Sequence, residues 1–291
     1  MVLPIVTIAP VVAKHSEIFR GYFDNQREFR HFENYLTGLI VLENKSLANI
    51  SRSIIESADK TNISRFLSKA PWEEHYINER RISYMIEQTA KQRRAREESC
   101  LILDDTLCEH VGSLFEYVAH HYDHSEDRYP LAHNVVTSFY ISGAVRFPVD
   151  LRTYRRYEEV TQWEKFVKKH FPGSTIPKGQ KQRKAFKQEV EAVLLKDKEF
   201  KQLHDEFQTK IELAQQIIEK AIERKLPFKV VLMDSWYLSE EIMEFLKERH
   251  KDWVSLLKKN RNLEVNSFTL YDQLGKPVKL QGPHIKVQDL V

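Results

Sequence analysis

Glycine and cysteine are scarce in this sequence, and it contains no long hydrophobic run. Eight glycines occur among 291 residues, and none belongs to a Gly-x-x-x-x-Gly-Lys loop, so we expect no nucleotide cofactor. The two cysteines, Cys100 and Cys108, cannot build a disulfide framework, which favours a reduced, cytoplasmic protein. The apolar start is interrupted by Pro4 and Pro10 and has no basic lead-in. The sequence therefore predicts neither a secretion signal nor a membrane span.

Charge of one sign is not in excess, but basic residues cluster locally. Lys+Arg 45 against Asp+Glu 42 gives a net charge of +3, which identifies no partner. Residues 161–190 nevertheless hold eight lysines and arginines against two acids, around a loop rich in proline and glycine. A second basic run covers residues 91–96. Such runs are usually solvated surface, but exposed basic loops also suit binding to nucleic-acid phosphates.

The first third of the chain, residues 1–98, has a helical pattern. Between residues 46 and 67, Leu47, Ile50 and Ile54 recur at helical spacing. Residues 59–62 interrupt this pattern with side chains that cap helices, and a second short helix is predicted after them. The arrangement is compatible with a helix-turn-helix that reads DNA, or with a plain helical hairpin.

Strands and helices alternate in the second part of the chain. Strands are predicted at 99–105, 133–143, 145–157, 228–233 and 253–257, and helices at 200–222 and 238–249. The first three strands suggest an antiparallel meander. The predicted fold class is α/β (a mixed α+β type), with a mixed sheet flanked by helices over residues 99–260. Residues 261–291 alternate weakly and resemble the start of a β-rich insertion.

Acidic side chains follow two of these strands directly. Asp104 and Asp105 come after the apolar run 101–103, and Asp234 comes after the run 230–233. The order β-β-β-α-β-α-β, with acids on the first and fourth strands, matches the ribonuclease H-like layout, in which those two strands lie side by side. Neighbouring side chains on a strand point to opposite faces, so at most one of Asp104 and Asp105 can face a metal ion. Each acid alone is equally compatible with a solvated turn or a helix cap.

Other groups of residues in the sequence give weaker indications of a functional site. Cys108, His110, His120, His121 and His124 do not have the paired spacing of a zinc site. Two serines, Ser113 and Ser235, lack the Gly-x-Ser-x-Gly context of a hydrolase nucleophile. We expect Trp236 and Tyr237 to be packing residues, with stacking on a flipped base as the alternative.

Five segments resemble DDE transposases of bacterial insertion sequences. They are 103–106 (Leu-Asp-Asp-Thr), 130–134 (Pro-Leu-Ala-His-Asn), 154–157 (Tyr-Arg-Arg-Tyr), 233–237 (Met-Asp-Ser-Trp-Tyr) and 256–261 (Leu-Leu-Lys-Lys-Asn-Arg). The resemblance implies metal-dependent DNA strand cleavage and transfer, with two Mg²⁺ or Mn²⁺ ions in the complete site. It implies Asp105 and Asp234 as catalytic metal ligands, with Asp104 the less favoured choice.

The resemblance also implies that the partners are transposon ends and target DNA, bound by a homodimer. The basic side chains expected to contact DNA are Arg93, Arg94, Arg96, Arg155, Arg156, Lys178, Lys181, Arg183, Lys184, Lys258, Lys259 and Arg261.

A third acid is expected in the family, a Glu on a helix after the last strand, and we find no such segment. Glu240, Glu241, Glu244 and Glu248 belong to the helix that follows the fourth strand, and Glu264 lies in a strand-like tail. We therefore expect an incomplete catalytic domain in a chain that ends early, and an inactive transposase. The alternatives are a non-catalytic DNA-binding remnant and an unrelated ribonuclease H-like nuclease.

Overall fold

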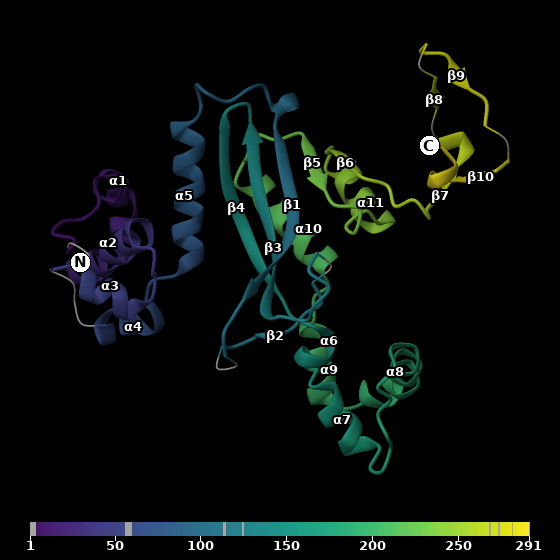
Figure 1. The fold of residues 1–291 in the computed structure, drawn as a ribbon, viewed down its shortest axis with the longest axis horizontal. Helices are drawn as coiled ribbons and strands as arrows, with labels where there is room; N and C mark the ends of the chain where they lie inside the picture. Colours follow the sequence, from purple (N-terminus) through teal and green to yellow (C-terminus); the bar gives the residue numbers. More distant parts are fainter. Residues whose placement is uncertain are drawn as a thin grey trace. The chain divides into compact units, whose positions relative to one another are not determined.

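The computed structural model describes residues 4–55, 60–112, 115–123, 125–267, 269–272, 274–280 and 282–290. The chain divides into two compact units, Met1–Ala90 and Lys91–Val291 (Figure 1). The first unit is built from helices, and the second contains a mixed sheet with helices around it.

Six helices make up the first unit. They are α1 (Pro10–His15), the 3-10 helix η1 (Ser16–Tyr22), α2 (Gln26–Val41), α3 (Leu47–Ser53), α4 (Lys60–Lys69) and α5 (Glu74–Gln88). The side chains of Asn25 and Ser46 accept hydrogen bonds from the first turns of α2 and α3, which fixes where these helices begin. Phenylalanines of α2 and α4 form one apolar cluster, and isoleucines of α3 and α4 form another.

Gly38 allows α3 to approach α2 closely. A Cβ atom at this position would lie 2.6 Å from a side-chain carbon of Ile50, which is completely buried. Helices α2, α3 and α4 contact one another, as either a helix-turn-helix or a helical hairpin requires. Residues 56–59, including the expected capping residue Asp59, lie outside the described residues. The choice between the two motifs therefore stays a prediction.

The second unit contains a six-stranded sheet. Its strands are β1 (Cys100–Glu109), β2 (Ala119–His120), β3 (Leu131–Ser142), β4 (Val145–Tyr154), β5 (Val230–Met233) and β6 (Asp252–Ser255). Strand β3 pairs antiparallel with β1, β2 and β4, whereas β5 runs parallel between β1 and β6. The predicted meander and the predicted contact between the first and fourth long strands are both confirmed. The two-residue strand β2 was not predicted.

Helices cover the sheet on the face that carries Leu101 and Leu103. These two side chains are buried, whereas Ile102 between them is half-buried and Asp104 is exposed. Helix α10 (Lys210–Glu223) contacts β3 and β4, and α11 (Glu240–Glu248) contacts β6 and α10 (Figure 1). This arrangement confirms the predicted fold class, a mixed sheet flanked by helices.

Four helices are inserted between β4 and α10. They are α6 (Tyr157–Val160), α7 (Trp163–His170), α8 (Gln180–Leu194) and α9 (Lys198–Glu206). They enclose an apolar cluster of their own, in which Trp163, Phe166 and Phe200 are completely buried. The loop that proline and glycine predict near residues 172–179 lies between α7 and α8. We call these four helices the inserted helices.

The prediction of one continuous helix over residues 200–222 was wrong. Helix α9 ends at Glu206, Phe207 adopts an extended conformation, and α10 begins at Lys210. The cause is local: Thr209 and Glu212 form a capping box, in which each side chain accepts a hydrogen bond from the other residue's N–H. The apolar stripe continues across this break, so periodicity alone did not reveal it.

Lys251 is a buried lysine beside β6, and it makes the stability of the fold depend on pH. Its ammonium donates a hydrogen bond of 2.8 Å to the carbonyl of Phe228 and lies 3.8 Å from the centre of that ring. Burial, with the nearby charges of Arg96 and Lys229, lowers the pKa of Lys251 from 10.5 to about 8. Between these two values the unfolded chain binds a proton at this lysine that the folded chain does not.

We therefore expect the free energy of unfolding to rise with pH between about 8 and 10.5, by up to about 3 kcal/mol from this group. Urea unfolding at several pH values measures this rise. The variant Lys251→Met should lose most of it and should be the more stable protein at pH 7. Equal pH profiles for the two proteins would show that Lys251 does not titrate in this range.

The carboxyl-terminal segment forms two small antiparallel pairs. β7 (Asn262–Glu264) pairs with β10 (His284–Lys286), and β8 (Leu270–Tyr271) pairs with β9 (Pro277–Val278). That this segment begins a β-rich insertion stays a prediction. Among the helices of the described residues, none has both the length and the hydrophobicity of a membrane-spanning segment.

Candidate active site

The parallel pairing of β1 with β5 places the predicted acids on neighbouring strands. Asp104 and Asp105 lie midway along β1, which continues to Glu109, so the prediction that the first strand ends at residue 105 was wrong. Leu103 of β1 lies opposite Met233 of β5, so Asp104 and Asp234 occupy the next positions along the two neighbouring strands. Both side chains line an open hollow of about 460 Å³, whose other walls are mostly apolar residues of β1, β5 and β6. Asp234 accepts a hydrogen bond of 2.5 Å from the N–H of Ser235.

Asp105 points to the opposite face of β1, toward the helices. Its Oδ2 accepts a hydrogen bond of 2.6 Å from the ammonium of Lys210, the first residue of α10. Its Oδ1 accepts a longer one, 3.4 Å, from the hydroxyl of Tyr237. Because side chains alternate along a strand, Asp104 faces the hollow and Asp105 faces Lys210.

The phenol of Tyr237 lies within the electrostatic reach of all three carboxylates. This side chain is completely buried, and burial is the main reason why its pKa is raised well above the ordinary value. The negative charges of Asp105, Asp104 and Asp234 raise it further, in that order. Asp105 contacts this hydroxyl directly, whereas Asp104 and Asp234 influence it only through their charge.

Carboxylate oxygens are the ligands that Mg²⁺ and Mn²⁺ prefer, so the donor set fits such an ion. The carboxylate of Asp105 already pairs with one cation, the ammonium of Lys210. The four glutamates of α11 are all exposed. Within the described residues, no glutamate forms a group of three possible ligands with Asp104, Asp105 or Asp234.

Another acidic cluster lies away from these residues. Carboxylate oxygens of Glu109, Asp123 and Glu126 lie within 4.8 Å of one another. The guanidinium of Arg128 donates to both glutamates, and Asp123 accepts hydrogen bonds from Ser125. This cluster is an exposed ion-pair network that contains none of the predicted ligands.

The histidines and cysteines do not form a zinc site among the residues that the structure describes. His110 contacts His133 at 2.7 Å, and His120 contacts the carbonyl of Tyr129 at 3.1 Å. Burial lowers the pKa of His121, and Cys108 is exposed. Two other residues weighed from the sequence, His124 and Ser113, lie outside the described residues.

The arginines predicted to bind DNA mostly have partners within the protein. Arg94 pairs with Glu98, Arg156 pairs with Glu159, Arg96 and Arg261 donate to backbone carbonyls, and Arg155 lies over the ring of Tyr117. Arg93 also has an interaction within the protein. The predicted lysines are different, because Lys178, Lys181, Lys184, Lys258 and Lys259 are all exposed.

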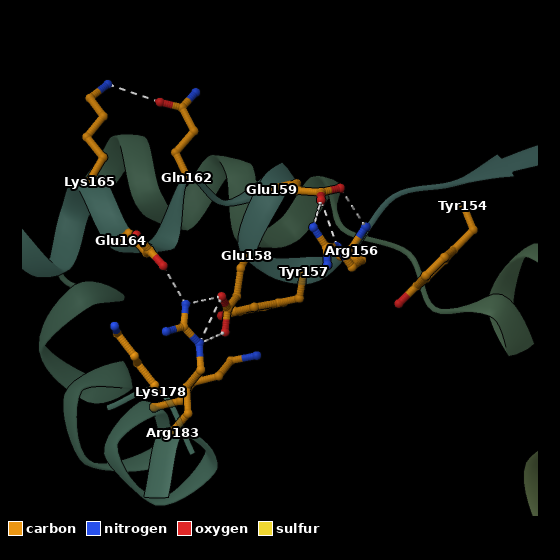
Figure 2. Close-up of a pocket in the computed structure, with 11 residues that line it drawn as sticks. Tyr154, Arg156, Tyr157, Glu158, Glu159, Gln162, Glu164, Lys165, Lys178 and Arg183 are labelled. Carbon is orange, nitrogen blue, oxygen red and sulfur yellow. Dashed lines mark hydrogen bonds and ion pairs between the residues drawn. The ribbon is translucent and has the colours of Figure 1, made fainter. Parts of the chain in front are cut away.

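Arg183 has the most extensive contacts of these arginines (Figure 2). Its guanidinium bridges Glu158 of α6 and Glu164 of α7, and it lies 5.1 Å from the centre of the Trp163 ring. These contacts tie α8 to α6 and α7 beside a pocket of about 900 Å³. Hydrogen bonds to the two glutamates raise the pKa of Arg183, which remains charged. Its place is within the inserted helices rather than on an exposed surface.

Sequence reasoning missed Lys210 and the hydroxyl of Tyr237. Tyr237 does pack in the core, as expected, but its hydroxyl also reaches Asp105. The capping box of Thr209 and Glu212 could have placed Lys210 at the start of a helix. It could not have shown that this lysine meets Asp105, which lies 105 positions earlier.

Comparison with known families gives a match that covers most of the chain. A family model described as DDE superfamily endonuclease matches residues 19–268, which include Asp104, Asp105, Asp234 and the inserted helices. No curated protein matches the chain significantly.

Proposed function

This chain belongs to the DDE superfamily endonucleases, and we propose that it is the transposase of an insertion sequence. The observation that carries the proposal is the parallel pairing of β1 with β5, which places Asp104 and Asp105, midway along β1, beside Asp234, the residue that follows β5. The family match implies a metal-dependent nuclease that acts on DNA. In transposition, water would attack the phosphodiester at a transposon end, and the freed 3′ hydroxyl would then attack target DNA.

We propose Asp105 and Asp234 as the ligands of a divalent ion, Mg²⁺ or Mn²⁺, with Asp104 less favoured. Support for Asp105 comes from the family resemblance of residues 103–106 and from its contact with Tyr237, in the turn that follows β5. The hollow that Asp104 shares with Asp234 supports the alternative. When bound, divalent ions activate the attacking oxygen and stabilise the leaving oxygen. The protein itself holds the carboxylates in place on the paired strands, in β1 and directly after β5, and Tyr237 donates a hydrogen bond to Asp105.

We propose that DNA phosphates bind three exposed lysines in the first turns of α8 and the loop before it, Lys178, Lys181 and Lys184, together with Lys258 and Lys259. All five side chains reach solvent, so phosphates can approach them. We further propose that the protein binds two transposon ends as a homodimer. A cytoplasmic location is supported by the free thiols of Cys100 and Cys108.

A second candidate is a DNA-binding protein that does not cut. It is favoured by one observation: among the described residues, no glutamate forms a group of three possible ligands with the predicted acids. A two-metal reaction that lacks one ligand should lose orders of magnitude in rate, because small errors in position are costly.

One experiment separates these functions. The purified 291-residue protein is incubated with Mg²⁺ or Mn²⁺ and DNA that carries the element's own terminal repeats, beside random DNA of equal length. Metal-dependent cutting or joining at the repeats supports the transposase. Selective binding to the repeats without cutting supports the second candidate. Cutting that ignores the repeats would contradict both and indicate a general nuclease.

A further inference from the structure

Lys210 occupies a position where a lysine is not favoured for the helix itself. It is the first residue of α10, at the end where the helix dipole is positive and repels cations. Its side chain is only 14% exposed, so the ammonium has also lost most of its water. Contacts with other parts of the protein must therefore hold it there.

Three separate elements supply those contacts. Asp105 of β1 accepts the hydrogen bond of 2.6 Å, and the rings of Tyr154 and Trp236 each have their centres 5.3 Å from the ammonium. Tyr154 ends β4, and Trp236 belongs to the turn after β5. A carboxylate and two aromatic faces thus enclose one cation, a combination that binds ammonium groups well.

The consequence for Asp105 is that its charge is already balanced within the protein. Its side chain is 28% exposed, and both of its oxygens have a donor, Lys210 on one and Tyr237 on the other. A divalent ion on the same carboxylate would lie within a few ångströms of the Lys210 ammonium. Two positive charges this close in a partly buried site repel each other strongly.

We propose that Lys210 is a positioning residue that holds Asp105 and competes with the divalent ion for it. Binding of the ion requires the ammonium to withdraw from Oδ2 of Asp105, so Lys210 sets the metal concentration at which the site fills. This inference rests on the proposed function, because it takes Asp105 as a metal ligand.

Titration calorimetry with Mn²⁺ alone, without DNA, tests this competition. Lys210→Met keeps the length of the side chain and removes its charge, and it should bind Mn²⁺ about tenfold more tightly than the parent. Lys210→Arg, which keeps the charge, should stay near the parent value. Lys220→Met is the matched control, because Lys220 lies on the same helix but is paired with Glu223 at the surface. Lys210→Gln repeats the test should the methionine variant not fold.

Unchanged or weaker Mn²⁺ binding by the folded, neutral variants would overturn the competition. The double variant Lys210→Met/Asp105→Asn separates this failure from failure of the proposed function. If Mn²⁺ binding depends on Asp105 but not on Lys210, only the competition is wrong. If binding is the same with and without Asp105, the proposed metal site itself is wrong, and the competition falls with it.

Discussion

Replacement of Asp234 by asparagine should reduce metal-dependent DNA cutting by roughly a hundredfold or more. Groups that merely support a metal ligand are worth 10- to 100-fold, so loss of a direct ligand should cost at least as much. Asparagine has nearly the same size and can still accept the hydrogen bond from Ser235, so the change chiefly removes charge. The rate of DNA nicking in Mn²⁺, compared with the rate in a sample whose metal has been removed by a chelator, measures the effect.

The same assay ranks the two neighbouring acids. Asp105→Asn should match the loss in Asp234→Asn, whereas Asp104→Asn should retain more activity. Glu244→Gln is the matched control, since Glu244 is exposed on α11 and lies close to Asp234 along the chain. Full activity in Asp105→Asn together with loss in Asp104→Asn would transfer the ligand role to the acid that lines the hollow.

Removal of three exposed lysines should weaken DNA binding about a hundredfold at moderate salt. In the triple variant Lys178→Gln/Lys181→Gln/Lys184→Gln, each lost phosphate contact should reduce the slope of log K against log salt by about 0.9. The slope should therefore change by about 2.7 in total, which corresponds to three phosphate contacts. Filter binding or fluorescence anisotropy at several salt concentrations gives both quantities.

Two further variants test whether the loss of DNA binding is specific to these three lysines. Lys196→Gln/Lys198→Gln/Lys201→Gln removes three exposed lysines from the same inserted helices and should leave the slope almost unchanged. Arg183→Met should lower the stability of these helices, through loss of its bridge to Glu158 and Glu164, more than it changes the slope. Equal slopes in the two triple variants would mean that DNA responds only to overall charge.

The sequence predicted those parts of the fold that depend on local pattern. The apolar runs 101–103 and 230–233 lie in β1 and β5, and the order of the predicted strands and helices correctly indicated that these two strands pair. Contacts between distant side chains were not predictable in this way. Arg183 was assigned to DNA because basic residues surround it, yet its carboxylate partners lie 25 and 19 positions earlier. The ion pair of Lys210 with Asp105 likewise has no local signal.

The resemblance to DDE transposases, and not strand alternation, favoured Asp105 over Asp104. Strand alternation made a separate prediction. It required Asp104 and Asp105 to face opposite sides, and the structure does separate them. Which side carries the helices depends on how α10 and α11 pack against the sheet, and periodicity does not encode that choice. The site therefore needed the three-dimensional arrangement, even though its residues were named from the sequence.

The affinity of Mn²⁺ in a double-mutant cycle tests the central claim, that residues 105 and 234 hold one ion together. Calorimetry would compare the parent with Asp105→Asn, Asp234→Asn and the double variant, all in the Lys210→Met background. Ligands of a shared ion should behave as a unit, so each single change should abolish most binding and the double variant should lose little more. Independent, additive losses, or binding that survives both changes, would contradict the account.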